Sequence, residues 1–490
     1  MKILFPTNSW LYDVMIRSFP VWKKMGVDII YDLLCLPHLT ALKKYLGDYL
    51  VDYSVYPSSI YDIWFSIDIT DENILRLEKK YQVVLNEMII YDLAMVKYKV
   101  IPPQKIRDEI YWRKLFVATF DYYEKLLNKH KPDYIFGEGP HGLGMKVLFE
   151  VSKKMDIPFF SISGSYFKDK AIFSYGRTGE NLILKKCFEN EAFLNKQDFK
   201  KGEEFILSVR HKREIPYYQV KFHKQKTKLF PTNCKIGLKA LYKLIKIYKM
   251  GRLLSALDYS YNPFWSPIFN RIPTYIKYKY ISKVALLPDY KQNYIVYFNH
   301  YQPEATTSCV APFYENQDNL LENIGKSTSG AMRFYVKEHT TNLGNRGKEF
   351  YSNLRNYTNV QLINPFASSF ELIEKSHMVL TISGTVGLEA IIMGKPVGVF
   401  SDCYYSFYPG VRRITEPEQI KNVINWGLYE FKKDEAAIKR FAAAYCKSLY
   451  PTFFSEKDGD ILGSELERFV EGILLFIDDY KNITSGARKN

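Results

Sequence analysis

The sequence lacks paired cysteines. Its six cysteines are scattered over 490 residues, and no two of them form a CxxC pair. Structural zinc sites and disulfide frameworks depend on closely or regularly spaced cysteines, so neither kind of site is expected. Unpaired thiols are typical of a reducing compartment, and the sequence therefore predicts a cytoplasmic protein.

Long apolar runs are absent as well. No stretch approaches the roughly 20 apolar residues that are needed to span a bilayer. Residues 1–8 are too short and too soon interrupted for a signal peptide, and they predict a first buried strand instead. We therefore expect a soluble protein, or one bound peripherally to the inner face of a membrane.

The sequence has fewer acidic than basic residues. The 68 Lys and Arg residues outnumber the 53 Asp and Glu residues, which gives a formal net charge of +15. Such an excess suits an anionic donor, an anionic glycan, an anionic membrane surface or nucleic acid. No nucleic-acid-binding motif accompanies it, so a nucleic acid is not predicted as a partner. No DxD motif follows a strand, so no metal is predicted either.

The chain is too long for one ordinary core, and at least two domains are expected. Short apolar strands alternate with helical segments, a pattern typical of α/β layers. We predict an N-terminal Rossmann-like domain over residues 1–285 and a second Rossmann-like domain over residues 286–455. Residues 456–490 are predicted to form a C-terminal helix that crosses back to the first domain.

Residues 200–285 differ from the rest, because they are rich in Lys and Tyr. Within them, Lys235–Leu257 has the apolar spacing of an amphipathic helix with a lysine face. Such a helix can lie on an anionic membrane. The alternative is a helix that packs on its own domain and turns its lysines to solvent.

The most informative stretch runs from Val379 to Phe400, and it predicts a strand, a tight turn, a short helix and a second strand. The turn is Ser383-Gly384-Thr385-Val386. Its small residues would let a phosphate approach the unpaired N–H groups of the helix start. An ordinary strand-to-helix packing joint is the alternative interpretation. Glu389 lies one helical turn after Thr385 and could accept hydrogen bonds from ribose hydroxyls.

Other predicted strand ends also carry polar groups. Lys337 and His339 flank Glu338 after one strand, and alternation places them on the same side, where they could neutralise a leaving phosphate. Further candidate donor or sugar contacts precede or follow this strand: Gln302, Glu304, Gln317, Ser368 and Ser369. In open α/β sheets ligands collect at the carboxyl ends of strands, so these groups are expected to share one site.

From about Tyr294 to Gly410 the chain resembles the capsule polysaccharide biosynthesis family, which includes Kdo transferases of bacterial surface glycans. The matching pieces occur in order: Gln302-Pro303-Glu304, Asn316-Gln317, Lys337-Glu338-His339, Gly344-Asn345-Arg346, Pro365, Ser368-Ser369, Ser383–Ala390, Gly394-Lys395-Pro396 and Tyr408–Val411. Thr340 stands where the family usually has Pro.

The resemblance implies a GT-B fold, in which two Rossmann-like domains face a cleft and the second domain holds the nucleotide donor. It implies a glycosyltransferase that uses a CMP-linked Kdo or another ulosonic acid as co-substrate, with no separate cofactor. The implied acceptor is a bacterial surface glycan or glycolipid.

Glu138 is the candidate catalytic carboxylate. It stands between Gly137 and Gly139 at the end of a predicted strand, where it would be sterically accessible as a base or a nucleophile. His141 could assist it or contact the acceptor. The alternative is a loop with an exposed glutamate.

Two other functions fit parts of the pattern. A non-hydrolysing nucleotide-sugar 2-epimerase would share the two-domain architecture and the phosphate turn. A non-catalytic protein that binds nucleic acid or anionic glycan would use the basic, Tyr-rich region, with salt-dependent affinity.

Overall fold

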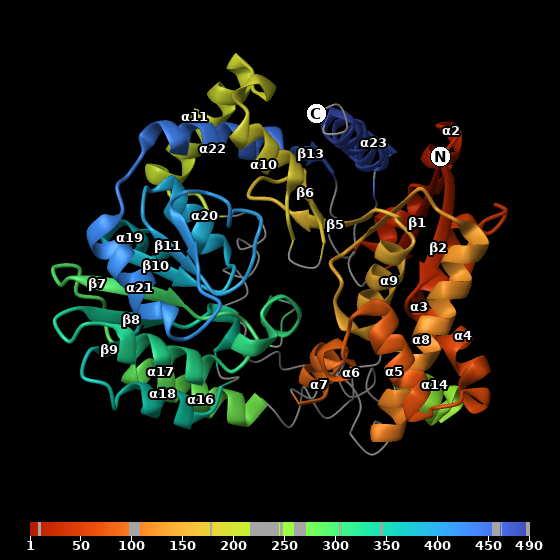
Figure 1. Cartoon of the computed structure of the whole chain (residues 1–490), viewed down its shortest axis with the longest axis horizontal. Helices are drawn as coiled ribbons and strands as arrows, with labels where there is room; N and C mark the ends of the chain where they lie inside the picture. The colour runs from red at the N-terminus through yellow and green to blue at the C-terminus, as the bar shows by residue number, and fades with distance from the viewer. Residues whose placement is uncertain are drawn as a thin grey trace. The chain divides into compact units, whose positions relative to one another are not determined.

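The computed structural model describes the chain except for residues 8–10, 98–107, 177–178, 216–244, 246–247, 259–270, 303, 305, 344–345, 453–460, 462 and 487–490. Two compact units emerge (Figure 1). Unit 1 comprises Met1–Arg177, Phe230–Ile268 and Leu449–Asn490, and unit 2 comprises Thr178–Leu229 and Phe269–Ser448.

Unit 1 is built on a seven-stranded sheet with the order β13-β6-β5-β4-β1-β2-β3. Its strands are β1 (Lys2–Thr7), β2 (Asp28–Leu33), β3 (Asp52–Val55), β4 (Tyr134–Gly137), β5 (Phe159–Gly164), β6 (Lys170–Tyr175) and β13 (Leu449–Pro451). The pairs from β3 to β5 are parallel, whereas β6 and β13 continue the sheet in antiparallel pairing. The predicted first strand is therefore an inner strand of a Rossmann-like sheet.

Helices cover both faces of this sheet. One face packs on α4 (Tyr56–Ile63), α5 (Asp71–Tyr81), α8 (Glu109–His130), α9 (Gly142–Lys154) and α14 (Arg252–Leu257). The other face packs on α2 (Phe19–Lys24) and α23 (Gly463–Gly486) through rings such as Phe5 and Phe136. Neighbouring residues of a strand point to opposite faces, so Leu4 and Phe5 serve different layers.

The helix ends of unit 1 follow from local sequence. Asp108 caps α8, since its carboxylate accepts a hydrogen bond from the backbone N–H of Tyr111 at 2.8 Å. The helix stops at Lys131, which takes a left-handed conformation with φ of 45°. This 22-residue helix buries its apolar side against the sheet.

Unit 2 is built on a six-stranded parallel sheet with the order β12-β11-β10-β7-β8-β9. Its strands are β7 (Tyr294–Phe298), β8 (Arg333–Lys337), β9 (Val360–Ile363), β10 (Met378–Thr381), β11 (Val397–Val399) and β12 (Val411–Arg413). Numbered from β7, this is the doubly wound order 3-2-1-4-5-6. The strands are almost wholly buried because both faces are covered.

Two helical layers cover the sheet of unit 2 (Figure 1). One layer consists of α16 (Arg271–Val284), α17 (Gln317–Ser327), α18 (Lys348–Leu354) and α21 (Gln419–Asn425). The opposite layer includes α19 (Ser369–Lys375) and α20 (Thr385–Ile392), with α11 (Lys196–Arg210) and α22 (Glu435–Lys447) packed beyond α20. Gly202 of α11 allows this packing, since a Cβ there would lie 2.6 Å from the backbone N of Ala443.

The predicted α/β class is confirmed, with two Rossmann-like units. The predicted domain boundary at residue 285 differs from the structure. Helices α10 (Leu182–Glu189), α11 and α16 pack with unit 2, whereas α23 packs with unit 1. That the two units face each other across a cleft stays a prediction.

Most of the predicted amphipathic helix Lys235–Leu257 lies outside the described residues. In its described part the helical conformation is interrupted at Gly251, which has a φ of 80°, and α14 follows as a separate short helix. A single continuous helix up to Leu257 is therefore wrong. Tyr248, predicted on the apolar side, is 89% exposed.

Candidate active site

The carboxyl ends of β7 and β10 meet at the centre of the unit 2 sheet. From this pair the strand order runs outward in both directions, through β8 to β9 and through β11 to β12. Such a reversal leaves a crevice above the strand ends, where α/β proteins bind ligands. His300 follows β7 and the Ser383–Val386 turn follows β10, so both lie at this point.

The turn after β10 leads directly into α20. Gly384 is the N-cap residue, and no side chain caps the helix. The backbone N–H of Gly384 donates to Thr381 Oγ1 at 3.2 Å, while the Gly384 carbonyl accepts from the Tyr405 hydroxyl at 2.6 Å. The turn is thus held by its own neighbours. No hydrogen bond from the N–H groups of Thr385 and Val386 is recorded among the described residues, so these groups are available to an anion.

Two glycines give this turn its shape. A Cβ at Gly384 would lie 3.0 Å from Thr381 Oγ1, and one at Gly387 would lie 2.3 Å from the Tyr405 hydroxyl. Any side chain at Gly387 would therefore displace the ring that fixes the Gly384 carbonyl. The small residues of the motif are needed for packing below the turn as well as for access above it.

Glu389 is almost completely buried in α20, with 3% of its surface exposed. Burial raises the pKa of its carboxyl to about 8, and the positive charge of Lys337 opposes the rise. No hydrogen bond to this carboxyl is recorded from any described residue. A buried carboxyl without a partner is costly, so a bound ligand with hydroxyl groups would relieve it.

Lys337, the last residue of β8, reaches toward α19. Its ammonium donates to Ser369 Oγ at 3.1 Å, and only 8% of the residue is exposed. Ser368 is the N-cap of α19, where its hydroxyl accepts from the backbone N–H of Glu371 at 3.3 Å. The two serines therefore position a helix end and a cation beside the predicted donor site. Direct ligand contacts by these serines stay a prediction.

His300 was not a predicted site residue, yet it lies at the centre of the strand reversal. Its Nε2 is 3.5 Å from both the Ser383 backbone N and Thr381 Oγ1. Burial lowers the pKa of its imidazole to about 3, so the ring is neutral. A single histidine after a strand matches no sequence motif. Its position beside the Ser383 turn follows from the pairing of β7 with β10, which the sequence does not show.

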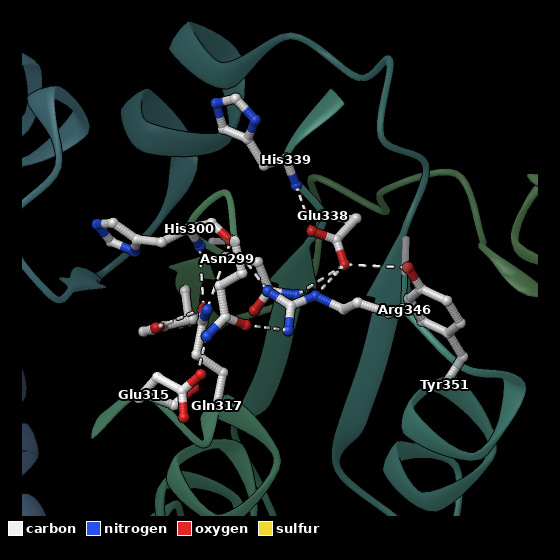
Figure 2. A network of polar contacts seen from close by, with 10 residues as sticks. Asn299, His300, Glu315, Gln317, Glu338, His339, Arg346 and Tyr351 are labelled. Carbon is white, nitrogen blue, oxygen red and sulfur yellow. Dashed lines mark hydrogen bonds and ion pairs between the residues drawn. The ribbon is translucent and has the colours of Figure 1, made fainter. Parts of the chain in front are cut away.

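A buried ion pair fixes the loops after β7 and β8 (Figure 2). The Arg346 guanidinium donates to Glu338 at 2.9 Å, to Gln302 Oε1 at 2.7 Å and to the His300 carbonyl at 2.9 Å. Glu338 is completely buried and also accepts from Tyr351, at 3.1 Å. Arg346 thus ties two strand ends together, and its role could not be predicted from Arg346 alone.

Two glutamines that were predicted to contact the donor also bond to the loops around them. Gln302 accepts from Arg346 and donates to the Glu315 carbonyl at 2.6 Å. Gln317 Oε1 accepts from the His300 backbone N–H at 2.9 Å. Both amides are bonded within the protein and support the loops, and their contacts with the donor stay a prediction. The sequence could not show this, because their partners lie 13 to 44 residues away.

Glu304 keeps its place among the candidates. The residue as a whole is partly exposed, whereas burial of its carboxyl raises the pKa of that group to about 7. The structure records no hydrogen bond to this carboxyl from the described residues. It could therefore exist in either protonation state near neutral pH.

His339 reaches solvent, and Figure 2 shows its ring directed away from the ion pair while its backbone N–H donates to Glu338 at 2.7 Å. Desolvation lowers the pKa of its imidazole; the Glu338 charge opposes this shift, and Lys337 and Arg346 add to it. The imidazole is neutral at pH 7 and can donate one N–H to an incoming phosphate.

The corresponding edge of unit 1 carries Glu138. It follows directly on β4, which lies beside β1 where that strand order also reverses. A Cβ at Gly137 would lie 2.9 Å from Pro6 Cγ, so the glycine permits the close approach of β4 to β1. Glu138 is partly exposed there. The predicted strand-end position is correct, and the catalytic role stays a prediction.

His141 is the N-cap residue of α9, and its ring lies over Gly139, since a Cβ at Gly139 would lie 2.5 Å from the His141 Cε1. Burial, and then the charge of Lys146, lower the pKa of His141 to about 4. Its Nδ1 has no hydrogen-bond partner in the described part of the chain. The first turn of α9 is not open to a ligand anion, because the Asp92 carboxylate accepts from the Leu143 N–H at 2.8 Å.

Metal ligands do not gather in the described residues: no group of three or more His, Cys, Asp or Glu side chains there could hold an ion. Among the same residues, no helix has the length and hydropathy that crossing a membrane requires.

Residues 219–442 match the profile of a family described as capsule polysaccharide biosynthesis protein. The predicted family resemblance is confirmed. The match covers somewhat less than half of the chain, and in unit 2 it includes both halves of the strand reversal. No curated protein matches the chain.

Solved structures show only distant similarity. The β-Kdo 2,4 transferase of Thermosulfurimonas dismutans KpsC is 12% identical, with 64% of this chain and 79% of that one covered and a TM-score of 0.37. For the UDP-GlcNAc 2-epimerase of Neisseria meningitidis the identity is 14%, the coverages are 97% and 100%, and the TM-score is 0.28. These low values carry no argument about activity.

Proposed function

We propose that the protein is a glycosyltransferase of capsule polysaccharide synthesis that takes its sugar from a nucleotide-linked donor. The observation that carries this proposal is the strand reversal of unit 2. It combines an uncapped helix start, a buried cation and a buried carboxyl without a hydrogen-bond partner among the described residues. A nucleotide offers the matching groups, namely phosphate and ribose hydroxyls.

In this proposal the Ser383–Val386 turn holds the donor phosphate through its N–H groups and hydroxyls. Glu389 accepts from the ribose. Lys337 and the neutral His339 stabilise the charge that grows on the phosphate as the glycosidic bond breaks. These groups supply the charge compensation that a metal gives in other transferases, and we expect transfer to continue in the presence of EDTA.

The finer specificity rests on the family resemblance. We propose a CMP-linked Kdo or related ulosonic acid as the donor, and a bacterial surface glycan or glycolipid as the acceptor. Glu138, at the strand reversal of unit 1, would act on the acceptor hydroxyl as a base, or on the sugar as a nucleophile. The excess of positive charge suits an anionic acceptor at the cytoplasmic face of a membrane.

The full chain can be tested by incubating it with CMP-Kdo and a Kdo-terminated glycolipid. The proposal predicts release of CMP that depends on the acceptor, with one sugar added to the acceptor mass. Formation of an epimeric nucleotide sugar without acceptor would instead indicate an epimerase. Salt-sensitive binding of DNA, with no binding of any nucleotide sugar, would overturn the proposal in favour of a basic binding protein.

A further inference from the structure

A groove of about 690 Å³ runs between α2 and α23 in unit 1. The two helices pack side by side (Figure 1) on the face of the sheet opposite α8. Val21, Met25, Leu474 and Leu475 form its apolar lining, which we call the floor. Met25 is 59% exposed and Leu475 is 43% exposed, so the groove presents apolar surface to solvent.

The groove also has an acidic lining, which we call its rim. Glu467, Glu471 and Asp478 line it from α23, and Lys24 is the only cation among the lining residues. The spacing of four and seven residues sets the three carboxylates along the same side of α23 as Leu474 and Leu475. No ion pair to these carboxylates is recorded within the described ranges. An unpaired acidic rim is unusual in a chain with a net charge of +15.

We propose that this groove is a docking site for a cationic amphipathic helix of a partner protein. An apolar floor between two helices fits the apolar side of such a helix, in the helix-in-groove mode of recognition. Its lysines or arginines would meet the carboxylates of the rim, which gives orientation and speeds association. The proposal concerns a surface remote in sequence from the donor site and does not depend on the transfer reaction.

The chain's own basic segment is the obvious competitor for the groove. That segment, Lys235–Leu257, ends in α14, and α14 packs with α4 and α8 on the opposite face of the same sheet. The described end of that segment thus packs away from the groove, and the partner we propose is a separate protein.

The test uses a fluorescent 18-residue helix of Leu and Lys with one apolar side, titrated into the full chain. We expect binding that weakens as salt rises, and at least tenfold weaker binding to the double variant Glu467→Lys/Glu471→Lys. Leu475→Glu should weaken it by a similar factor. A scrambled peptide of the same composition, which has no apolar side, should bind no better to the parent than to the variants.

The matched control is Glu416→Lys/Glu418→Lys, which reverses the charge of two exposed residues in unit 2. It should bind the peptide as the parent does. Equal affinity for parent and groove variants would overturn the proposal, provided circular dichroism shows that the variants are folded. Self-association of the parent that the groove variants abolish would also overturn it, because a second copy of the chain would then fill the groove.

Discussion

At the scale of single residues, the donor site depends on groups held in costly states. Glu389 has a pKa of about 8 and His300 a pKa of about 3, both because burial disfavours the charged form. A folded protein keeps such groups at the expense of stability, and perturbed groups collect at functional sites. The cost can be measured separately from the activity.

Glu389→Gln should stabilise the protein increasingly as pH rises. The pKa of Glu389 rises from an ordinary 4.5 to about 8 on folding, so the native state binds this proton more tightly. Between pH 4.5 and pH 8 the unfolded chain loses this proton while the native state keeps it, so the stability of the parent falls as pH rises. Glutamine has no proton to lose and avoids that fall. We expect the advantage of the variant to grow by about 1–4 kcal/mol between pH 5 and pH 8 in denaturant unfolding. The exposed control Glu416→Gln should show no such trend, and a flat difference for Glu389→Gln would contradict the buried, unpaired carboxyl.

His339→Ala should impair transfer more than donor binding. Its neutral ring can donate to the leaving phosphate, and a contact that strengthens only in the transition state lowers kcat and kcat/KM together. We expect a loss of at least tenfold in kcat at saturating donor, with nucleotide affinity changed less than threefold. A normal kcat would remove His339 from the chemical step.

Glu138→Gln keeps the size of the side chain and removes its charge. If Glu138 is base or nucleophile, the variant should bind donor normally and turn over at least a hundredfold slower. Intact mass without acceptor separates the two roles, since only a nucleophile leaves a sugar on the parent chain. Near-parental turnover would place the catalytic carboxylate elsewhere.

At the scale of elements, the strand-end loops are held by bonds between distant residues. Arg346 joins the loops after β7 and β8, and Glu338 lies wholly buried beneath it. Such loops carry the site because a rigid sheet positions them. The stability of this pair is therefore linked to the geometry of the donor site.

Arg346→Met should destabilise the protein by about 3–5 kcal/mol, because it leaves the Glu338 charge buried without its partner. Adding Glu338→Gln should recover part of the loss. The exposed Arg355, just beyond α18, offers a control, and Arg355→Met should cost less than about 0.5 kcal/mol. A loss for Arg346→Met as small as that of the control would mean that the pair contributes little.

At the same scale, sequence patterns predicted some elements well and others poorly. The strand, turn and helix around Ser383 were predicted, since a buried apolar run ends there in small polar residues. The role of Asp92 and the bridging role of Arg346 were not predicted, because they come from contacts with residues 51 and 44 to 46 positions away. Single-residue chemistry is visible in a sequence, whereas the partner of a buried charge is not.

At the scale of the whole molecule, the chain passes back and forth between the two units, so neither unit is one continuous segment. Helices α10, α11 and α16 belong to unit 2, although the sequence places them before its first strand. Composition marked residues 200–285 as different, yet it could not say which sheet they cover. The assignment depends on close packing, such as that of Gly202 against the α22 backbone, and no local pattern encodes it.

The central claim is that a nucleotide binds at the strand reversal of unit 2. Calorimetric titration of CMP, UDP and GDP into the parent and into Thr385→Val tests it most directly. We predict that one nucleotide, CMP by the family resemblance, binds the parent and raises its unfolding temperature. Loss of a hydrogen bond to a charged phosphate costs about 1.5–3 kcal/mol, so the folded variant should bind it about 10- to 150-fold more weakly. Unchanged affinity in Thr385→Val, or no binding of any of the three nucleotides by the parent, would contradict the claim.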